Sequence, residues 1–374
     1  RVIEIDVTKM TKEALINTGL GTKEIDRCKN MFGLGFLLWM YNRSMETTQK
    51  FITEKFAKNE VVKDANLTVL KAGYYFGDTN ETFTSRYEVE SAHLPKGSYR
   101  SIMGNQAAAL GAIVGAKKAG LELFYGSYPI TPASDILHEL ARHKNYGVKT
   151  FQAEDEIAAV CAAIGASYGG SLGVTASSGP GIALKGEAIG LAIMLEIPLL
   201  IINVQRGGPS TGLPTKTEQS DLMQAMYGRN GEAPLAIVSA SSPSDCFDAM
   251  MEAVRITVEH MTPVIFLSDG FIANGSEPWS YPKAVDLPKI TPRFADPEKS
   301  LDDGAYYPYR RNADLVREWA IPGMENLQHR VGGLEKENET GNVSYDPHNH
   351  ELMVKIRQEK VDLIANDIPE QELA

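Results

Sequence analysis

Short apolar runs alternate with longer stretches rich in alanine, isoleucine and glycine between Gly104 and Trp279. Such alternation is typical of an α/β domain with a largely parallel sheet, whose crossover helices lie close against the strands. The predicted strands are Leu121–Tyr125, Val148–Gln152, Gly173–Ala176, Leu199–Val204, Leu235–Ser239 and Val264–Ser268. The predicted helices include Glu156–Tyr168 and Ile182–Leu195.

The chain before this domain shows a different pattern. Ile3, Ile5 and Val7 alternate with polar residues and predict a half-buried strand that has no neighbouring strand close behind it. Apolar residues between Lys29 and Gly77 recur at spacings near 3.6, which predicts helices at the end of a small α/β unit. An unpaired first strand indicates that the sequence begins inside a domain.

Residues between Asp78 and Ser101 are polar and lack periodicity, as in a surface linker, so we place a boundary near Gly97. Three parts are expected: residues 1–97 as the end of an α/β domain plus a linker, residues 98–285 as the main domain, and residues 286–374 as an extended connection and a helix that lead to a following domain.

The composition of the chain argues against several classes of function. The 374 residues carry a net charge of -11, which opposes nucleic-acid and anionic-membrane partners by repulsion. No apolar run reaches the roughly 20 residues of a membrane span. Cys28, Cys161 and Cys246 lie far apart, so a zinc site or an iron–sulfur cluster built by this chain alone is not expected. Sparse cysteines fit a soluble protein of the reducing cytoplasm.

Polar residues follow four successive predicted strands. These segments are Ser127–Pro132, Glu154–Glu156, Ser177–Gly181 and the long glycine- and proline-rich stretch Arg206–Lys216. Ligands of open α/β sheets bind beyond the carboxyl ends of the strands, which lie at one edge. The sequence therefore predicts a single site built from these four segments.

The motifs SYPITP, AEDE, TASSGPG and VQRGGPSTGLPTKTEQSDL resemble the α subunit of 2-oxoacid:ferredoxin oxidoreductases, and the last is closest to the 2-oxoglutarate branch. The likeness is strong from Gly104 to Trp279. It extends weakly back to the helices after Lys29, which resemble the end of a fused γ-type domain, and forward to Pro369. The family has most of a γ domain before this point and a further domain after it, so the resemblance implies a fragment of a longer polypeptide.

The resemblance assigns Glu156 as the catalytic acid that hydrogen-bonds N1′ of the aminopyrimidine of thiamine diphosphate. Such an acid must be desolvated, as a helix start against an apolar wall allows. We expect Gly165 to let this helix pack closely. The alternative is that Glu154, Asp155 and Glu156 are first-turn acids that complement the helix dipole. We favour that alternative for the first two residues and the catalytic role for Glu156.

In the family that the motifs resemble, the residue that matches Arg206 binds the substrate carboxylate. A guanidinium suits this task because it can form two parallel hydrogen bonds to a carboxylate. Thr131 and Thr215 would add hydroxyl groups near the substrate. The alternatives are a solvated arginine at a strand end, turn capping by Thr131 and an ordinary loop position for Thr215. The resemblance also implies four residues that line the cofactor pocket: Tyr128, Ile130, Ser178 and Gly179.

The chain lacks the GDG motif, followed later by asparagine, through which thiamine enzymes hold diphosphate and its cation. Mg2+, the diphosphate and a 4Fe–4S cluster are therefore expected on a β subunit, with no metal on this chain. A cofactor shared between chains implies a heteromer, and the resemblance suggests a dimer of αβ heterodimers that reduces ferredoxin.

The resemblance implies conversion of 2-oxoglutarate, coenzyme A and oxidised ferredoxin to succinyl-CoA, carbon dioxide and reduced ferredoxin, or the reverse carboxylation. Pyruvate or another 2-oxoacid is the nearest alternative substrate. A transketolase-like or decarboxylating thiamine enzyme is disfavoured by the missing diphosphate motif. A non-catalytic assembly or electron-transfer subunit is disfavoured by Glu156 and Arg206 at the strand ends.

Overall fold

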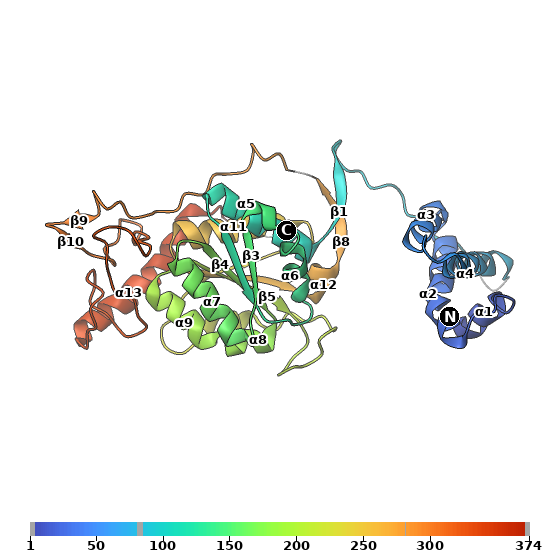
Figure 1. The fold of residues 1–374 in the computed structure, drawn as a ribbon, viewed down its shortest axis with the longest axis horizontal. Helices are drawn as coiled ribbons and strands as arrows, with labels where there is room; N and C mark the ends of the chain where they lie inside the picture. The colour runs from blue at the N-terminus through green and yellow to red at the C-terminus, as the bar shows by residue number, and fades with distance from the viewer. Residues whose placement is uncertain (1–3, 81–84, 281, 371–374) are drawn as a thin grey trace. The chain divides into compact units, whose positions relative to one another are not determined.

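The structure, a computed structural model, describes residues 4–80, 85–280 and 282–370. The chain divides into two compact units, Arg1–Lys96 and Gly97–Ala374. Figure 1 shows the helices of the first unit and the central sheet of the second. Two assignments stay predictions. One gives the first unit to a γ-type domain, and the other makes residues 286–374 a connection toward another domain.

The described part of the first unit is helical, as the apolar spacing predicts. Two of its helices pack so closely that a Cβ atom on Gly73 would lie 1.9 Å from the carbonyl oxygen of Phe32. Glycine permits this approach because it has no side chain. The helices are α1 (Val7–Ala14), α2 (Thr22–Met40), α3 (Glu46–Lys55) and α4 (Glu60–Thr79).

The strand predicted at Ile3, Ile5 and Val7 is wrong. Val7 opens α1, because the carboxylate of Asp6 accepts a hydrogen bond from the backbone N–H of Lys9 at 2.9 Å and caps the helix. Ile3 lies outside the described residues. The local cap therefore prevails over the short alternation of apolar residues.

The second unit is built on a six-stranded parallel sheet with the order β3-β2-β4-β5-β7-β6. All six predicted strands are confirmed, and the largest shift is in β2, which begins and ends later than expected. The strands are β2 (Leu123–Ser127), β3 (Val148–Gln152), β4 (Leu172–Ser177), β5 (Leu199–Gln205), β6 (Ala236–Ser239) and β7 (Pro263–Asp269).

The predicted linker is too long at its end. Tyr99–Met103 forms β1, which pairs antiparallel with β8 (Ser276–Ser280) in a two-stranded sheet. The pairing joins the start of the second unit to a segment beyond the last strand of the main sheet. Sequence periodicity cannot reveal it, because the hydrogen-bonding partner lies far along the chain.

Helices cover both faces of the main sheet (Figure 1). One face packs against α5 (Gly104–Ala119), α6 (Ser134–Leu140) and α11 (Asp245–Glu259), and the other against α7 (Glu156–Tyr168) and α9 (Gly186–Leu195). The doubly covered arrangement explains why the central strands β4, β5 and β7 are buried along their whole length.

Strand glycines let α7 lie close to the sheet. A Cβ atom on Gly173 would lie 2.3 Å from the carbonyl oxygen of Ala163, and one on Gly126 would lie 2.6 Å from that of Ala159. The expectation that Gly165 plays this role is wrong, since a Cβ atom there would meet nothing within 4 Å. The close approach is made from the strand side of the contact.

The predicted helix Ile182–Leu195 is two helices, α8 (Gly179–Leu184) and α9, which meet at Lys185. The break coincides with a side chain that turns inward. The ammonium group of Lys185 donates to Thr175 Oγ1 at 2.9 Å and to the carbonyl of Ala176 at 3.1 Å, both on β4. The apolar pattern predicts one continuous helix, and this prediction is wrong.

The segment after β8 is mostly irregular, with α13 (Pro347–Leu363) at its end, and one buried acid attaches it to the sheet domain. Glu196 directly follows α9, and its carboxylate binds Arg311 and accepts a hydrogen bond from Lys360 at 2.9 Å. Arg317 donates to the carbonyls of Leu195 and Glu196, both at 3.1 Å. Cations at a helix C-terminus are favoured by its partial negative charge.

We expect Glu196→Gln to lower the free energy of unfolding by about 3–5 kcal/mol, because Arg311 and Lys360 would stay buried without a counter-charge. Urea denaturation measures this change. Glu122→Gln is the control, since it removes an exposed ion pair to Lys149 and should cost at most about 1 kcal/mol. Equal effects of the two substitutions would contradict the anchoring role of Glu196.

The same anchor predicts a dependence on pH. Burial by itself raises the pKa of Glu196, but the charges and hydrogen bonds of Lys360 and Arg311 lower it well below its usual range. A carboxylate with a lowered folded-state pKa stabilises the fold fully above its unfolded pKa, 4.5, and loses this contribution as the pH falls further. The stability difference between wild type and Glu196→Gln should therefore shrink below that pH; a pH-independent difference would refute the assignment.

Candidate active site

The carboxyl ends of β2, β4 and β5 meet at one edge of the sheet. Ser127 of β2 is paired with Ala176 of β4, and Ser177 of β4 with Asn203 of β5. The polar side chains of Ser127, Ser177 and Asn203 are buried at this edge. The polar residues predicted to converge at this edge therefore do so.

Glu156 stands at the start of α7 above this edge. Asp155 caps the helix by accepting a hydrogen bond from the N–H of Ala158 at 2.7 Å, which leaves the neighbouring Glu156 free of that task. The side chain of Glu156 is 8% exposed. Asp155 thus caps the helix rather than standing in its first turn, where the sequence interpretation placed it, and Glu156 is buried.

Gly181 makes room for the carboxyl group. A Cβ atom on Gly181 would lie 2.9 Å from Glu156 Oε1 and 1.9 Å from Ser177 Oγ. Ser177 Oγ is buried and makes no hydrogen bond within the described part of the chain. A buried hydroxyl group without a hydrogen-bond partner lowers the stability of a protein. The three residues therefore form a closely packed polar cluster, called the recess below, whose unpartnered hydroxyl suits a ligand with hydrogen-bonding groups.

A buried cation contacts the residue that precedes Ser177 on β4. Lys185 is 0% exposed and holds its ammonium group against β4. Burial lowers the pKa of Lys185 to about 7, while the negative charge of Glu156 raises it. Sequence reasoning gave Lys185 no role; its signal was that it is the only positively charged residue between Lys149 and Arg206.

Arg206 connects two loops of the site. Its guanidinium donates to the carbonyl of Thr131 and to that of Thr211, both at 2.7 Å, and its side chain is 6% exposed. Arg206 Nε is buried and makes no hydrogen bond to the described residues. The side chain is not the solvated arginine of the alternative interpretation. It holds the segment after β2 beside the loop after β5 and leaves the Nε–H without a partner among the described residues.

The loop after β5 is closed by its own backbone. The N–H of Gly207 donates to the carbonyl of Lys216 at 2.9 Å, and the N–H of Leu213 donates to that of Gly207 at 2.8 Å. Gly212 has φ +53° and comes so close that a Cβ atom would lie 1.9 Å from the Gly207 oxygen. Thr215 is exposed on this loop. The hydrogen bonds given above hold Thr131 to Arg206 but do not include Thr215.

An amide and acid network beside the loop was missed by sequence reasoning. Asn203 donates to Asp221 Oδ2 at 3.0 Å, and the N–H of Asp221 donates to Gln205 Oε1 at 2.9 Å. Asp221 Oδ2 also lies 3.2 Å from the position of a Cβ atom on Gly179. The two amides at alternate positions of an otherwise apolar strand were the available signal, but their partner follows a long loop.

The other predicted pocket residues have different surroundings. Ser178 is fully buried, and its hydroxyl donates to the carbonyl of Val204 at 2.8 Å, so it ties β4 to β5. The N–H of Ile130 donates to Ser134 Oγ at 2.9 Å in the turn that starts α6. Tyr128 is 40% exposed. Ser178 therefore holds the ends of β4 and β5 together, while Tyr128 lies at the surface.

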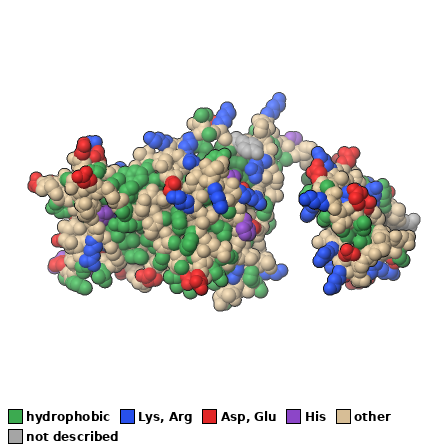
Figure 2. Space-filling model, in the orientation of Figure 1, with side chains coloured by type: hydrophobic (Ala, Val, Ile, Leu, Met, Phe, Trp, Pro, Cys, Tyr) green, Lys and Arg blue, Asp and Glu red, His purple; other side chains and the backbone are tan. Residues whose placement is uncertain are grey.

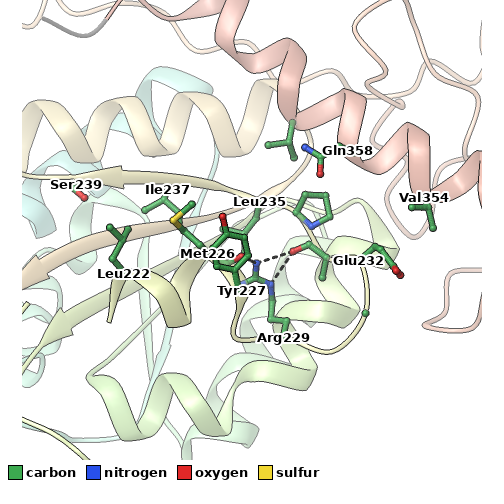
Figure 3. A pocket seen from close by; sticks show the side chains of 14 residues that line it. Leu222, Met226, Tyr227, Arg229, Glu232, Leu235, Ile237, Ser239, Val354 and Gln358 are labelled. Carbon is green, nitrogen blue, oxygen red and sulfur yellow. Dashed lines mark hydrogen bonds between the residues drawn. The ribbon is translucent and has the colours of Figure 1, made fainter. Parts of the chain in front are cut away.

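A cavity of about 810 Å³ lies between α10 (Leu222–Tyr227), β6 and α13 (Figure 3). Arg229 lines it and donates to carbonyls of Ala225 and Ala233, so it closes the end of α10 and the following turn. The cavity lacks the buried acid and the unpartnered hydroxyl of the strand-end recess. We therefore place the candidate active site at the recess, where the reactive groups converge.

Two absences among the described residues limit the chemistry of the site. Within the ranges that the structure describes, no group of three or more His, Cys, Asp or Glu residues could hold a metal ion. No helix among these residues is both long and apolar enough to cross a membrane. Figure 2 shows acidic and basic side chains interspersed over the face in view, with apolar side chains among them.

Comparisons with known proteins agree with the resemblance. The model of the family "pyruvate flavodoxin/ferredoxin oxidoreductase, thiamine diP-binding" matches residues 114–346. The chain is 56% identical to 2-oxoglutarate oxidoreductase subunit KorA of Mycobacterium tuberculosis, over 96% of this chain and 54% of that protein. It is 38% identical to 2-oxoglutarate synthase subunit KorA of Methanothermobacter marburgensis, over 70% of this chain and 66% of that protein.

A solved structure shares the fold. The 2-oxoglutarate:ferredoxin oxidoreductase of Magnetococcus marinus, solved with 2-oxoglutarate, coenzyme A and succinyl-CoA bound, matches with a TM-score of 0.81 and 35% identity, over 96% of this chain and 60% of that one. The chain thus spans about half to two thirds of the length of these relatives. Since the family model covers most of the sheet domain, the chain belongs to the thiamine-diphosphate-binding pyruvate flavodoxin/ferredoxin oxidoreductase family.

Proposed function

We propose that this chain forms the aminopyrimidine-binding half of the active site in the α subunit of a 2-oxoglutarate:ferredoxin oxidoreductase. The observation that carries the proposal is the buried carboxyl group of Glu156, which shares a recess with the unpartnered hydroxyl of Ser177 over Gly181. The recess suits a heterocycle with ring nitrogens, since the side chains of Glu156 and Ser177 offer hydrogen-bonding groups to it.

Thiamine diphosphate, when bound, supplies a thiazolium carbon that attacks the keto carbon of a 2-oxoacid and accepts the electrons left by decarboxylation. The task of Glu156 is to hydrogen-bond ring N1′ and to exchange a proton with that atom. A buried position suits this task because water does not compete for the proton. Tyr128, Ile130, Ser178 and Gly179 would line the cofactor pocket around this contact.

Arg206 is the proposed site for the substrate carboxylate. Two of its N–H groups already hold the carbonyls of Thr131 and Thr211, so the guanidinium is fixed in orientation before a substrate arrives. Its unused N–H groups can donate to a carboxylate, and Thr131 and Thr215 would add hydroxyl donors. The names of the relatives and the 2-oxoglutarate bound in the solved neighbour favour that substrate; pyruvate is the alternative within the family.

An exposed apolar strip beside Glu156 supports a shared active site. Ile157, Cys161 and Gly165 follow one another at four-residue intervals on the outer side of α7, and Leu184 of α8 lies 54% exposed. Contiguous exposed apolar side chains next to a site are typical of a protein interface. We propose that a β subunit covers this strip and supplies the diphosphate contacts, Mg2+ and a 4Fe–4S cluster.

The remaining assignments follow from this arrangement. The complex would be a cytoplasmic dimer of αβ heterodimers that uses coenzyme A as co-substrate and passes electrons to ferredoxin. The family names and the coenzyme A bound in the solved neighbour support the reaction. A non-catalytic assembly subunit would have no need of a buried acid beside an unpartnered hydroxyl, so we do not favour it.

Exchange of the C2 hydrogen of thiamine, measured beside steady-state kinetics in the full-length complex, tests the two principal roles. Glu156→Gln keeps the shape but removes the acid, so C2 exchange and turnover should fall by orders of magnitude while oxoacid affinity changes little. Arg206→Lys should raise the apparent KM for 2-oxoglutarate on the order of 10- to 100-fold and leave C2 exchange near wild type. Wild-type exchange in Glu156→Gln would overturn the proposed function.

Gly181→Ala tests the recess by geometry alone. The added methyl group would collide with Ser177 Oγ and Glu156 Oε1, so cofactor affinity and C2 exchange should both fall about 10-fold or more. Gly190→Ala on α9 is the matched control, because a Cβ atom there meets nothing within 4 Å. The control should bind cofactor normally and gain up to about 1 kcal/mol of stability. Normal cofactor binding by both variants would exclude the recess as the pocket.

Ile157→Asp tests the proposed subunit interface. A charge at this 50% exposed position should weaken assembly with the β subunit at least about 10-fold, because it would be desolvated in the complex. Sedimentation of the mixed subunits measures assembly. Val285→Asp, at an exposed position outside the strip, serves as control. If both variants assemble like wild type, the strip is not the interface.

A further inference from the structure

The loop between β5 and α10 begins with Arg206 and is mostly open to solvent. Residues 208–211 and 213–220 are exposed. An exposed loop cannot be held by burial of apolar side chains, so its shape depends on the hydrogen bonds that tie it to the rest of the protein. The contacts of its returning half, residues 216–221, therefore bear on the orientation of Arg206.

Two side chains of the returning half bind groups outside it. Glu218 Oε2 accepts a hydrogen bond from the N–H of Gly208 at 3.0 Å, which joins the two halves of the loop. Gln219 donates to Asp269 Oδ2 at 2.7 Å and so reaches the carboxyl end of β7. Both contacts fix the middle of the returning half.

Asp221 fixes the end of the loop. Its carboxylate accepts a hydrogen bond from Asn203 at 3.0 Å, and its N–H donates to Gln205 Oε1 at 2.9 Å. Both partners lie on β5, directly before Arg206, so the loop returns to the strand end from which it starts. A compact loop with neighbouring ends keeps its shape through such contacts of its own residues.

The carboxylate of Asp221 is not used to cap the following helix. Aspartate at the position before a helix usually accepts a hydrogen bond from an N–H of the first turn, but the side chain of Asp221 makes no such bond to the described residues of α10. It binds Asn203 instead, which is fully buried. Its Oδ2 also lies 3.2 Å from the position of a Cβ atom on Gly179. The acid thus stands between the loop and the turn that starts α8.

We infer that Asp221 is a positioning residue of the oxoacid site, whose contact with Asn203 holds the loop in the shape that orients Arg206. The inference rests on the proposed function, in which Arg206 binds the substrate carboxylate. Asp221 does not need to touch the substrate. A guanidinium that is already fixed loses little freedom on binding, so release of the loop end should weaken the binding of the oxoacid.

A purely structural role is the competing explanation. Asp221 could serve only to stabilise the junction of β5 and α10, and its loss would then lower stability without a specific effect on oxoacid binding. Asp245 offers a matched control. It accepts hydrogen bonds from the N–H and the hydroxyl of Ser241, at 2.7 and 2.8 Å, at the start of α11.

The experiment measures the KM for 2-oxoglutarate and the C2 exchange of thiamine in the full-length αβ complex. We expect Asp221→Ala to raise KM about tenfold or more through loss of a charge-assisted hydrogen bond, with kcat and C2 exchange near wild type. Asp221→Asn keeps an oxygen that can accept from Asn203 and should restore most of the affinity. Asp245→Ala should leave KM near wild type.

A double variant tests whether Asp221 acts through Arg206. Effects of two residues that act as a unit are not additive, whereas effects of independent residues multiply in KM. The KM of Asp221→Ala combined with Arg206→Lys should therefore lie close to that of Arg206→Lys alone. Full multiplication of the two single effects would overturn the inference.

The remaining outcomes separate the inference from the function on which it rests. A wild-type KM in Asp221→Ala, an equal rise in Asp245→Ala, or no recovery in Asp221→Asn overturns the positioning role. A wild-type KM in Arg206→Lys instead overturns the oxoacid site of the proposed function. If Asp221→Ala does not assemble, Asn203→Leu removes the same hydrogen bond from the side of β5; a wild-type KM in that variant would also overturn the positioning role.

Discussion

Close packing of α7 on the sheet is the constraint on which the site depends. Gly126 and Gly173 let the helix approach until no Cβ atom fits between strand and helix backbone. The first residue of the helix, Glu156, is thereby placed over Gly181 at the carboxyl edge of β4. A larger residue at either strand position would lift the helix and move the acid, so the reactivity of the edge depends on glycines beneath it.

Two buried acids of the sheet domain illustrate different uses of the same electrostatics. Glu196 binds Arg311 and Lys360 directly, and this closed arrangement attaches the last part of the chain to the domain. Glu156 instead lies beside Gly181 and Ser177 at the strand ends and forms no ion pair with the described residues. Direct contact with two cations holds an acid ionised, whereas an acid without such partners keeps its carboxyl oxygens available to a ligand.

Arg206 combines structural and chemical tasks in one side chain. It binds the carbonyls of Thr131 and Thr211 and so holds together two loops that are far apart in the sequence. A guanidinium fixed by its own protein loses little further freedom when it binds a carboxylate. The same bonds explain how a long glycine- and proline-rich loop can keep one shape beside the strand ends.

Local patterns determined much of this protein. The apolar runs predicted all six strands of the main sheet, and the helix beginning at Glu156 was predicted with its bounds, because periodicity and propensity act over neighbouring residues. The resemblance located the strand-end motifs, although the chemical roles of Glu156 and Arg206 stay proposals. Features that need a distant partner were decided only by the tertiary structure.

The pairing of β1 with β8, the break at Lys185 and the contact between Asn203 and Asp221 show why. In each case the deciding atom lies beyond the range of local periodicity, on another strand or after a loop. Gly165 was chosen for close packing because it lies in the helix, but the open side of that helix was not visible in the sequence. A linear pattern states which residues are apolar or small; only the packed chain states which surfaces they meet.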